Sequence, residues 1–163
     1  MERRLPFRIG SGYDVHRFAP DRELWLGGVQ IPFERGLLGH SDADVLLHAI
    51  CDAILGALAL RDIGYHFPDT SDEYAGADSK ELLKRVSEMI PEQGYCIGNI
   101  DATIVAERPK INPHIPQIQQ VIAQILEINP NQVSIKASTN EKMGAIGREE
   151  GIMALATVLL IAQ

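Results

Sequence analysis

Residues 39–60 read GHSDADVLLHAICDAILGALAL and predict the clearest helix of the chain. Ser41 is a good N-cap, Asp44 stands three residues later at the capping-box position, and Asp42 adds negative charge near the positive end of the helix. Helical spacing then continues to about Leu60. The apolar side chains that follow this spacing are Val45, Leu46, Ala49, Ile50, Ile54 and Leu58. The segment therefore predicts a helix that packs an apolar face against a core.

Strands are expected on both sides of this helix. Residues 7–18 contain the strand formers Ile9, Tyr13 and Val15, and the glycines among them disfavour a helix. A tight hairpin is expected to turn at Gly27-Gly28. The other expected elements are hairpin strands over residues 24–26 and 29–31, loops over 32–39 and 61–77, helices over 79–89 and 113–128, and strands over 95–106 and 132–138.

The segment 152–162 is almost wholly apolar. Periodicity alone does not separate a buried strand from a helix there. A strand or a helix of this composition needs cover on both faces. One short domain is not expected to supply all of that cover. The segment therefore hints at an oligomer.

Length and composition favour one soluble, unexported domain over residues 1–163. No stretch approaches about 18 uninterrupted apolar residues, and no apolar core of signal-peptide length follows the basic N-terminus, so neither a membrane span nor a secretion signal is expected. The cysteines, Cys51 and Cys96, lack CxxC spacing and are expected to be small core residues in a reducing compartment.

The net charge of -7 argues against binding to nucleic acid through its phosphates. It leaves a small phosphorylated substrate open, because metal ions and backbone amides can supply positive charge locally. An acidic protein that handles diphosphates is expected to recruit cations.

The first candidate site is Asp14-Val15-His16. Residues two apart on a strand project from one face, about 6.5 Å apart. A carboxylate and an imidazole are thereby aimed at one point, as a metal site requires. The alternative is a surface salt bridge or polarity at the edge of a hairpin.

His48 is the second candidate, since it is the one imidazole on an otherwise apolar helix. Such a histidine is more often a satisfied core residue than a ligand. Here Asp44 and Asp52, four residues to either side, could accept a hydrogen bond from its other ring nitrogen. With Asp14 and His16 it would form a three-ligand set with an open fourth position, typical of catalytic zinc. His40 stands just before the expected N-cap, near the anion-attracting helix end.

Two further segments carry weaker signals. Lys136 to Gly144 leaves a strand into a turn rich in hydroxyl and carboxylate groups, which suits a phosphate or its Mg²⁺. The alternative is a polar loop with an N-cap. Ala106 to Ile111 is a basic, proline-bearing turn after a strand end, where ligand sites are frequent.

Taken together, these segments resemble the 2-C-methyl-D-erythritol 2,4-cyclodiphosphate synthase family, from about residue 8 to residue 161. The similar blocks, in order, are Arg8-Ile9-Gly10, Gly12-Tyr13-Asp14-Val15-His16, Leu26-Gly27-Gly28, the run from Gly36 to Asp44, Asp62-Ile63-Gly64, Phe67-Pro68-Asp69-Thr70, Gly76-Ala77-Asp78-Ser79, Gly98-Asn99, Asp101, Pro109-Lys110, Glu141-Lys142 and Gly144. The spacing of so many short blocks is highly specific.

The resemblance implies an α+β fold: a mixed β-sheet with helices on one face, and sheets packed around the axis of a homotrimer with active sites between subunits. It makes residues 152–161 a strand. It also implies a cytoplasmic enzyme of bacterial type, or a plastid stroma enzyme if the chain is a processed form, with no nucleic-acid or membrane partner.

The resemblance also implies roles for individual residues. Zinc ligands fall on Asp14, His16 and His48, and transition-state stabilising positions fall on His40 and Thr139. Glu141 matches the residue that holds a second divalent ion, Mg²⁺ or Mn²⁺, on the diphosphate. The implied substrate-binding residues are Ser41, Asp62, Ile63, Gly64, Phe67, Pro68, Asp69, Thr70, Ala106, Pro109, Lys110, Ile111, Ser138 and Arg148.

The implied reaction converts 4-diphosphocytidyl-2-C-methyl-D-erythritol 2-phosphate to the cyclic diphosphate and CMP, in the non-mevalonate isoprenoid pathway. The alternatives are a zinc-dependent phosphatase or nucleotide hydrolase, and a non-enzymatic trimer that binds isoprenoid diphosphates. Two residues depart from the family pattern. Ala145 stands where phenylalanine is frequent, and Glu149 replaces a common glycine beside Arg148, which weakens the case for isoprenoid binding at the trimer axis.

Overall fold

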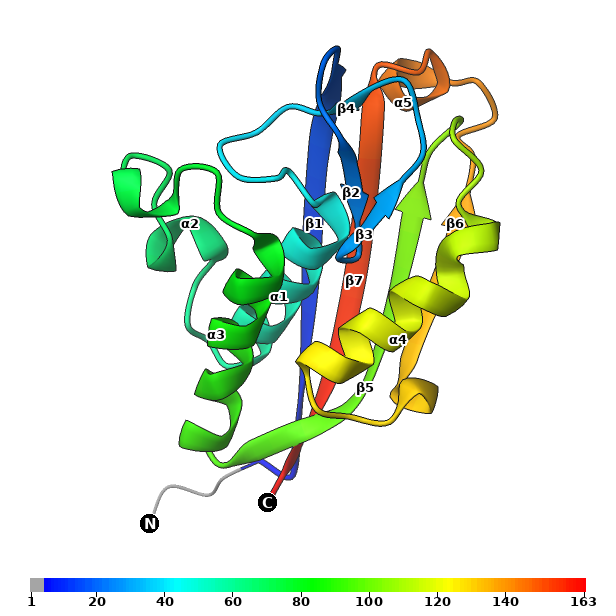
Figure 1. The fold of residues 1–163 in the computed structure, drawn as a ribbon. Coiled ribbons are helices and arrows are strands. Elements are labelled where there is room, and N and C mark those ends of the chain that lie inside the picture. The colour runs from blue at the N-terminus through cyan, green and yellow to red at the C-terminus, as the bar shows by residue number, and fades with distance from the viewer. Residues whose placement is uncertain (1–4) are drawn as a thin grey trace.

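Two layers make up the computed structural model, which describes residues 5–163: a five-stranded sheet and the helices on one of its faces (Figure 1). The elements are β1 (Phe7–Ala19), β2 (Leu24–Leu26), β3 (Val29–Ile31), β4 (Gly36–Leu37), α1 (Val45–Ala57), α2 (Ile63–His66), η1 (Asp72–Tyr74), α3 (Ser79–Glu92), β5 (Tyr95–Val105), η2 (Asn112–His114), α4 (Ile115–Ile125), η3 (Pro130–Gln132), β6 (Val133–Ser138), α5 (Gly144–Gly147) and β7 (Gly151–Ala162).

The sheet is mixed, with strand order β4-β1-β7-β5-β6. β7 pairs antiparallel with β1 on one side and with β5 on the other. β5 and β6 are parallel and are joined through α4, as a parallel pair requires. The mixed α+β fold expected from the resemblance is therefore confirmed, as are the strand at residues 152–161 and the glycine hairpin of β2 and β3.

The start of α1 differs from the prediction. Asp44 is the N-cap and accepts a hydrogen bond from Leu47 N at 3.1 Å, whereas Ser41 Oγ accepts one from Ala43 N at 3.2 Å. Ala43 has φ 58°, so the chain is not helical there. Asp44 also accepts hydrogen bonds from both glycine amides of the hairpin turn, Gly27 and Gly28. The expectation that Ser41 caps the helix was wrong. Asp44 caps it instead, because its carboxylate accepts hydrogen bonds from both the helix and the β2–β3 turn.

Other boundaries differ by a few residues. α1 ends at Ala57, before the expected Leu60, and α3 runs past residue 89 to Glu92. Residues 61–77, expected as a loop, contain the short turns α2 and η1. Among residues 5–163, no helix is long and apolar enough to cross a membrane.

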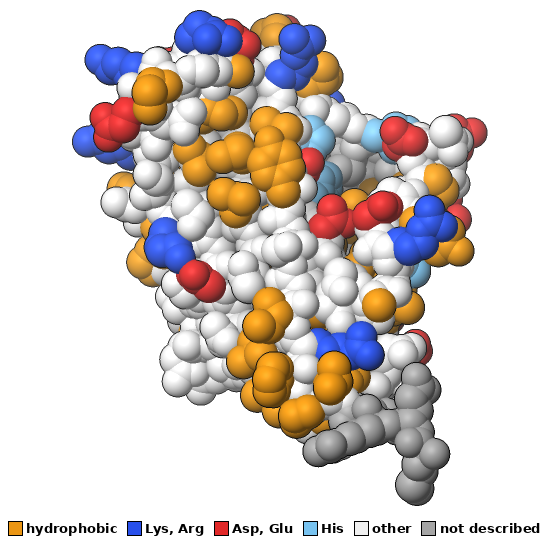
Figure 2. All heavy atoms as spheres, turned by 180° about the vertical axis from the view of Figure 1, so that it is seen from behind, with side chains coloured by type: hydrophobic (Ala, Val, Ile, Leu, Met, Phe, Trp, Pro, Cys, Tyr) orange, Lys and Arg blue, Asp and Glu red, His pale blue; other side chains and the backbone are white. Residues whose placement is uncertain are grey.

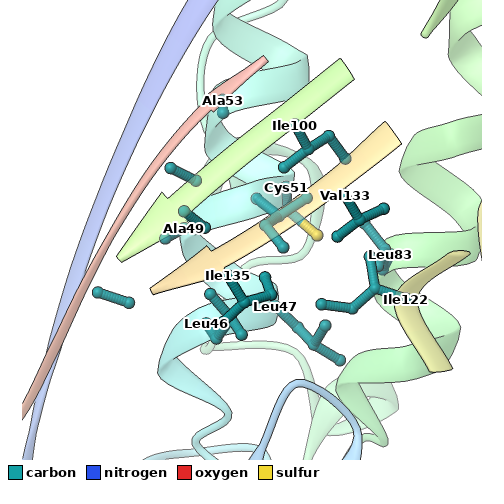
Figure 3. Close-up of a cluster of buried hydrophobic side chains, with 14 of the residues drawn as sticks. Leu46, Leu47, Ala49, Cys51, Ala53, Leu83, Ile100, Ile122, Val133 and Ile135 are labelled. Atoms are coloured by element: carbon teal, nitrogen blue, oxygen red, sulfur yellow. The ribbon is translucent and has the colours of Figure 1, made fainter. Parts of the chain in front are cut away.

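The core lies between α1 and the sheet. Figure 3 shows Leu46, Leu47 and Ala49 of α1 among Ile100 of β5, Val133 and Ile135 of β6, Leu83 of α3 and Ile122 of α4. Cys51 is buried there as expected, whereas Cys96 is only partly buried, and both thiols are free. Ile152, Ala154, Ala156, Val158 and Leu160 of β7 are all buried, because alternate strand residues face the helices.

The other face of the sheet is open in the single chain (Figure 2). Its apolar side chains come from the alternate positions of the paired strands β1 and β7. They include Phe7, Ile9, Tyr13 and Val15 of β1 and Leu155 and Ile161 of β7, which are 43–65% exposed. The chain thus covers one face of β7 and leaves the opposite face without a partner within residues 5–163.

Candidate active site

Asp14 and His16 lie on the helix-facing side of β1, in line with Gly10 and Gly12. A Cβ built on Gly12 would stand 1.8 Å from the carbonyl oxygen of Ala49, so α1 rests directly on the β1 backbone. This close approach places His48, the residue before Ala49, beside the next inward-facing residues of the strand. The local sequence thus brings a helix histidine to a strand carboxylate and a strand histidine.

The three side chains form a compact cluster. Asp14 Oδ2 lies 2.9 Å from His16 Nε2 and 3.1 Å from His48 Nδ1. One possible ligand atom from each residue lies within 4.8 Å of the others. A carboxylate and two imidazoles are a donor set that suits zinc and leaves a fourth position open. The triplet predicted from sequence is therefore brought together.

The second ring nitrogen of each histidine already has a partner. His16 Nδ1 lies 2.8 Å from the Leu38 carbonyl oxygen, and His48 Nε2 lies 2.8 Å from Ser79 Oγ and 3.3 Å from Ser41 Oγ. A carbonyl can only accept, so His16 Nδ1 carries a hydrogen and its Nε2 remains for a metal. Such outer contacts orient ligating histidines. The chemistry of the cluster therefore fits a divalent cation.

The predicted partners of His48 were wrong. Asp44 faces the hairpin glycines, as described above, and Asp52 Oδ1 accepts a hydrogen bond from Ile63 N at 2.7 Å. Both carboxylates are engaged by backbone amides because they cap or join neighbouring elements. The hydroxyl of Ser79, far away in sequence, takes the place expected for them.

The cluster shifts the titration of its members. Burial alone would favour the neutral acid at Asp14, but hydrogen bonds from His16 and His48 and their charge outweigh burial and lower the pKa of Asp14 to about 2. Burial would also favour neutral His16, yet the hydrogen bond and charge of Asp14 raise the pKa of His16 above 6.5. A metal ion and the His16 proton therefore compete for one site.

A cavity of about 290 Å³ opens beside the cluster. Its lining includes His16 and His48 together with the predicted residues His40, Ser41, Ile63, Gly64, Phe67 and Asp69, and also Tyr74 and Leu82. Asp62 caps α2 by accepting a hydrogen bond from Tyr65 N and lies outside the lining, as do Pro68 and Thr70. Most of the expected methylerythritol-phosphate segment thus lines the cavity that His16 and His48 also line.

A separate cavity of about 260 Å³ lies at the ends of β5 and β6. The predicted residues Ala106, Pro109, Lys110, Ile111, Ser138 and Thr139 line it. The two cavities share no lining residue, and β7 lies between β1 and β5 in the sheet. The single chain therefore does not bring Thr139 to His40.

Glu141 and Arg148 line neither of these cavities. Glu141 N donates to Thr139 Oγ1 at 3.3 Å, and Arg148 Nε donates to Glu150 Oε1 at 2.7 Å. Sequence reasoning missed Glu107, whose Oε1 accepts hydrogen bonds from Asn140 N and Lys142 N. Glu107 therefore ties the turn that carries Glu141 to the wall of the second cavity.

The two departures from the family pattern lie at the surface nearby. Ala145 is exposed in α5. Glu149 Oε2 lies 3.4 Å from Arg35 and 3.7 Å from Arg108, so its added charge is compensated within the chain.

A larger cavity of about 430 Å³ lies between α3, α4 and the start of β5, and none of the predicted site residues lines it.

Comparisons with known proteins identify the family of the chain. The YgbB family model matches residues 7–161. The chain is 60% identical to a 2-C-methyl-D-erythritol 2,4-cyclodiphosphate synthase of Porphyromonas gingivalis, over 96% of this chain and 97% of the relative. It is also 60% identical to the synthase of that name from a Nostoc species, over 97% and 96% of the two chains.

Solved structures show the same fold. IspF of Plasmodium falciparum in a CDP complex superposes with a TM-score of 0.87 at 37% identity, over 99% of both chains. The bifunctional IspDF of Campylobacter jejuni gives a TM-score of 0.93 at 43% identity, and the match covers 96% of this chain and 42% of that longer one.

Proposed function

This chain belongs to the YgbB family, and from that premise we propose that it forms 2-C-methyl-D-erythritol 2,4-cyclodiphosphate in isoprenoid biosynthesis. The observation that carries the proposal is the cluster of Asp14, His16 and His48, whose two histidines line a cavity that the expected substrate segment also lines. The substrate is 4-diphosphocytidyl-2-C-methyl-D-erythritol 2-phosphate.

The reaction needs no protein nucleophile. An oxygen of the 2-phosphate forms a bond to the β-phosphorus, the bond from that phosphorus to the bridging oxygen breaks, and CMP leaves with this oxygen. The protein's task is to align two phosphate groups that repel each other. Holding both groups of one molecule in line can contribute about 7–11 kcal/mol to the barrier reduction.

Asp14, His16 and His48 would hold the first cation, a zinc ion. A zinc ion held there would act as a Lewis acid, which would attract phosphate oxygens and offset their mutual repulsion. His40 and Ser41 line the same cavity, and their polar groups would contact the phosphates. Asp69, Phe67 and Gly64 would enclose the methylerythritol part and exclude water.

The second half of the substrate would occupy the cavity at β5 and β6. Ala106, Pro109, Lys110 and Ile111 would surround the cytidine there, with Ser138 and Thr139 toward the diphosphate. Glu141 would hold Mg²⁺ or Mn²⁺ on the diphosphate, where negative charge builds up as CMP departs. Arg148 would act at the edge of this region.

A homotrimer would bring the two halves together. The open apolar face of β1 and β7 supports a subunit interface, and the separation of the two cavities supports an active site completed by a neighbouring subunit. Each subunit would contribute its metal cluster to one site and its cytidine cavity to the next. Each chain would be a single domain over residues 1–163, and the bacterial relatives support a cytoplasmic location.

Product analysis tests the proposed reaction. The purified, zinc-loaded protein is incubated with the diphosphocytidyl substrate and Mg²⁺, and phosphorus NMR identifies the products. Equal amounts of CMP and cyclic diphosphate are expected. Inorganic phosphate in their place would assign the site to a phosphatase or nucleotide hydrolase. Tight binding of an isoprenoid diphosphate without turnover or affinity for CDP would make the trimer a carrier.

A further inference from the structure

The buried hydroxyl of Ser79 lies at the back of His48, on the side away from Asp14. Its Oγ is 2.8 Å from His48 Nε2, and the residue has no exposed surface. Ser79 is the first residue of α3, so its backbone is set by a helix start. The hydrogen bond to this fixed hydroxyl restrains rotation of the imidazole.

Asp42 determines the direction of this hydrogen bond. Ser79 Oγ donates its single hydrogen to Asp42 Oδ1 in a short hydrogen bond. The oxygen of Ser79 can then only accept from His48 Nε2–H. The hydrogen on His48 Nε2 is thereby fixed, and Nδ1, which faces Asp14, is the nitrogen that remains for a metal ion. The Asp42 carboxylate thus orients the His48 imidazole through the Ser79 hydroxyl.

Asp42 is itself held firmly. Its Oδ2 accepts a hydrogen bond from Ser79 N at 3.0 Å, and its Oδ1 accepts another from Asp44 N at 3.1 Å. Two backbone hydrogen bonds join the same segments, from Gly76 N to His40 O at 2.9 Å and from Asp42 N to Ala77 O at 3.2 Å. The block Gly76-Ala77-Asp78-Ser79, which the sequence comparison singled out without a role, therefore fastens α3 to the loop that carries His40.

We propose, on the basis of the metal centre proposed above, that Ser79 is a positioning residue for a divalent cation. With Asp42 it fixes the tautomer and orientation of His48, so that Nδ1 is ready to bind the metal. Partners that accept a hydrogen bond from a ligating histidine strengthen metal binding, and their loss costs about 10–100-fold in affinity. Ser41 Oγ is the other hydroxyl near Nε2, but at 3.3 Å it is more distant and already accepts from Ala43 N.

The test compares zinc binding by the full-length, metal-free protein and its variants, measured by competition with a chromogenic chelator. Ser79→Ala removes only the hydroxyl oxygen and introduces alanine, a good helix former. The variant should bind zinc about 10–100-fold more weakly. Ser79→Thr retains the hydroxyl and should recover most of the affinity. Ser87→Ala is the matched control, because Ser87 lies on the same helix and its exposed hydroxyl donates only to Lys84 O.

Two further measurements separate positioning from folding. Thermal unfolding of the metal-free proteins should show that Ser79→Ala still folds cooperatively, because Ser79 N and the backbone bonds of Gly76 and Ala77 still join α3 to the His40 loop. The visible spectrum of bound Co²⁺, which depends on ligand geometry, should change in Ser79→Ala and be retained in Ser87→Ala. Unaltered zinc affinity and an unaltered cobalt spectrum in Ser79→Ala would overturn the role of Ser79. A wild-type protein that binds neither ion would instead overturn the metal centre itself.

Discussion

The backbones of Gly12 and Ala49 are in direct contact: a Cβ on Gly12 would stand 1.8 Å from the Ala49 carbonyl oxygen. Gly10 makes the corresponding approach to the Ala53 carbonyl oxygen, at 1.9 Å. These two contacts set the distance between β1 and α1, and with it the distance between Asp14 and His48. The packing of Gly10 and Gly12 against α1 therefore determines both the stability of this contact and the geometry of the metal cluster.

Gly12→Ala should lower the free energy of unfolding by about 1–3 kcal/mol or more, because the added methyl group meets backbone that cannot move aside. It should also lower zinc content, since α1 must shift. Urea unfolding and metal analysis measure the two effects. Gly56→Ala is the control: Gly56 is exposed on α1, and a Cβ there would make only an ordinary contact with the Ser11 carbonyl oxygen at 3.7 Å, so alanine should stabilise by up to about 1 kcal/mol. Equal stability of the Gly12 variant and wild type would refute the close packing.

His48→Ala should abolish stoichiometric zinc and turnover while leaving the oligomer folded, because it removes one of three ligands and little core surface. Metal analysis and sedimentation of the purified variant measure both outcomes. His114→Ala, in η2 and outside the cluster, should retain zinc and serves as the control. Full zinc content in His48→Ala would remove this histidine from the metal centre.

The metal-free protein should show a pH window of stability due to Asp14 and His16. The lowered pKa of Asp14 contributes stability that is present above its usual value of 3.8 and is lost as the pH falls toward about 2. The raised pKa of His16 contributes stability that is complete below 6.5 and is lost as the pH rises through its folded-state pKa. The pair therefore stabilises most between these two limits.

Asp14→Asn should make the free energy of unfolding depend less on pH. At pH 5 to 6 it should lower that free energy by on the order of 2 kcal/mol. Urea unfolding of the chelator-treated proteins at several pH values measures it. Zinc affinity of the wild type should rise with pH above 6, since binding displaces the His16 proton. Parallel stability curves for wild type and Asp14→Asn would contradict the pairing.

Glu141→Gln should separate substrate binding from chemistry. The amide keeps a carbonyl ligand but loses the negative charge, which weakens affinity for a hard cation. Turnover should fall steeply at low Mg²⁺ and recover partly as Mg²⁺ or Mn²⁺ is raised, whereas zinc content and CDP binding without Mg²⁺ stay nearly unchanged. The assay is a magnesium titration of CMP release. If variant and wild type reach half-saturation at the same magnesium concentration, Glu141 does not bind the second cation.

Mixed oligomers should show whether active sites are shared. His48→Ala leaves the cytidine cavity intact and Thr139→Ala leaves the metal cluster intact, so each variant alone should be inactive. Co-refolding them in equal amounts should restore about a quarter of the sites if each site joins two subunits. Native mass spectrometry confirms that mixed species form. Mixed trimers without activity would place the whole site within one chain.

Local patterns in the sequence predict much of this fold. Alternation on β1, helical spacing on α1 and the glycine turn between β2 and β3 all operate over a few residues. They correctly place Asp14, His16 and His48 on elements whose faces can meet. The resemblance settles β7, for which periodicity leaves both structures open.

The errors arise where one polar side chain serves two distant elements. Ser41 and Asp44 are both good N-caps, and the hairpin glycines that decide between them lie far back in the sequence. In the same way, Asp52 could reach His48 by spacing alone, but the Ile63 amide occupies it. Ser79 was missed because no spacing rule links it to His48. Tertiary contacts, and not propensity, decide each case.

The pairing of β1 with β7 also governs how the chain can fold. Tyr13 and Leu155 are direct partners in the middle of the sheet, although nearly the whole chain separates them. Most of β1 therefore has no partner strand until β7 has been synthesised. Closing so long a loop is entropically costly, and domains dominated by such distant pairings fold slowly. Until β7 is made, the backbone edge of β1 is unpaired, and an unpaired strand edge favours aggregation of the nascent chain.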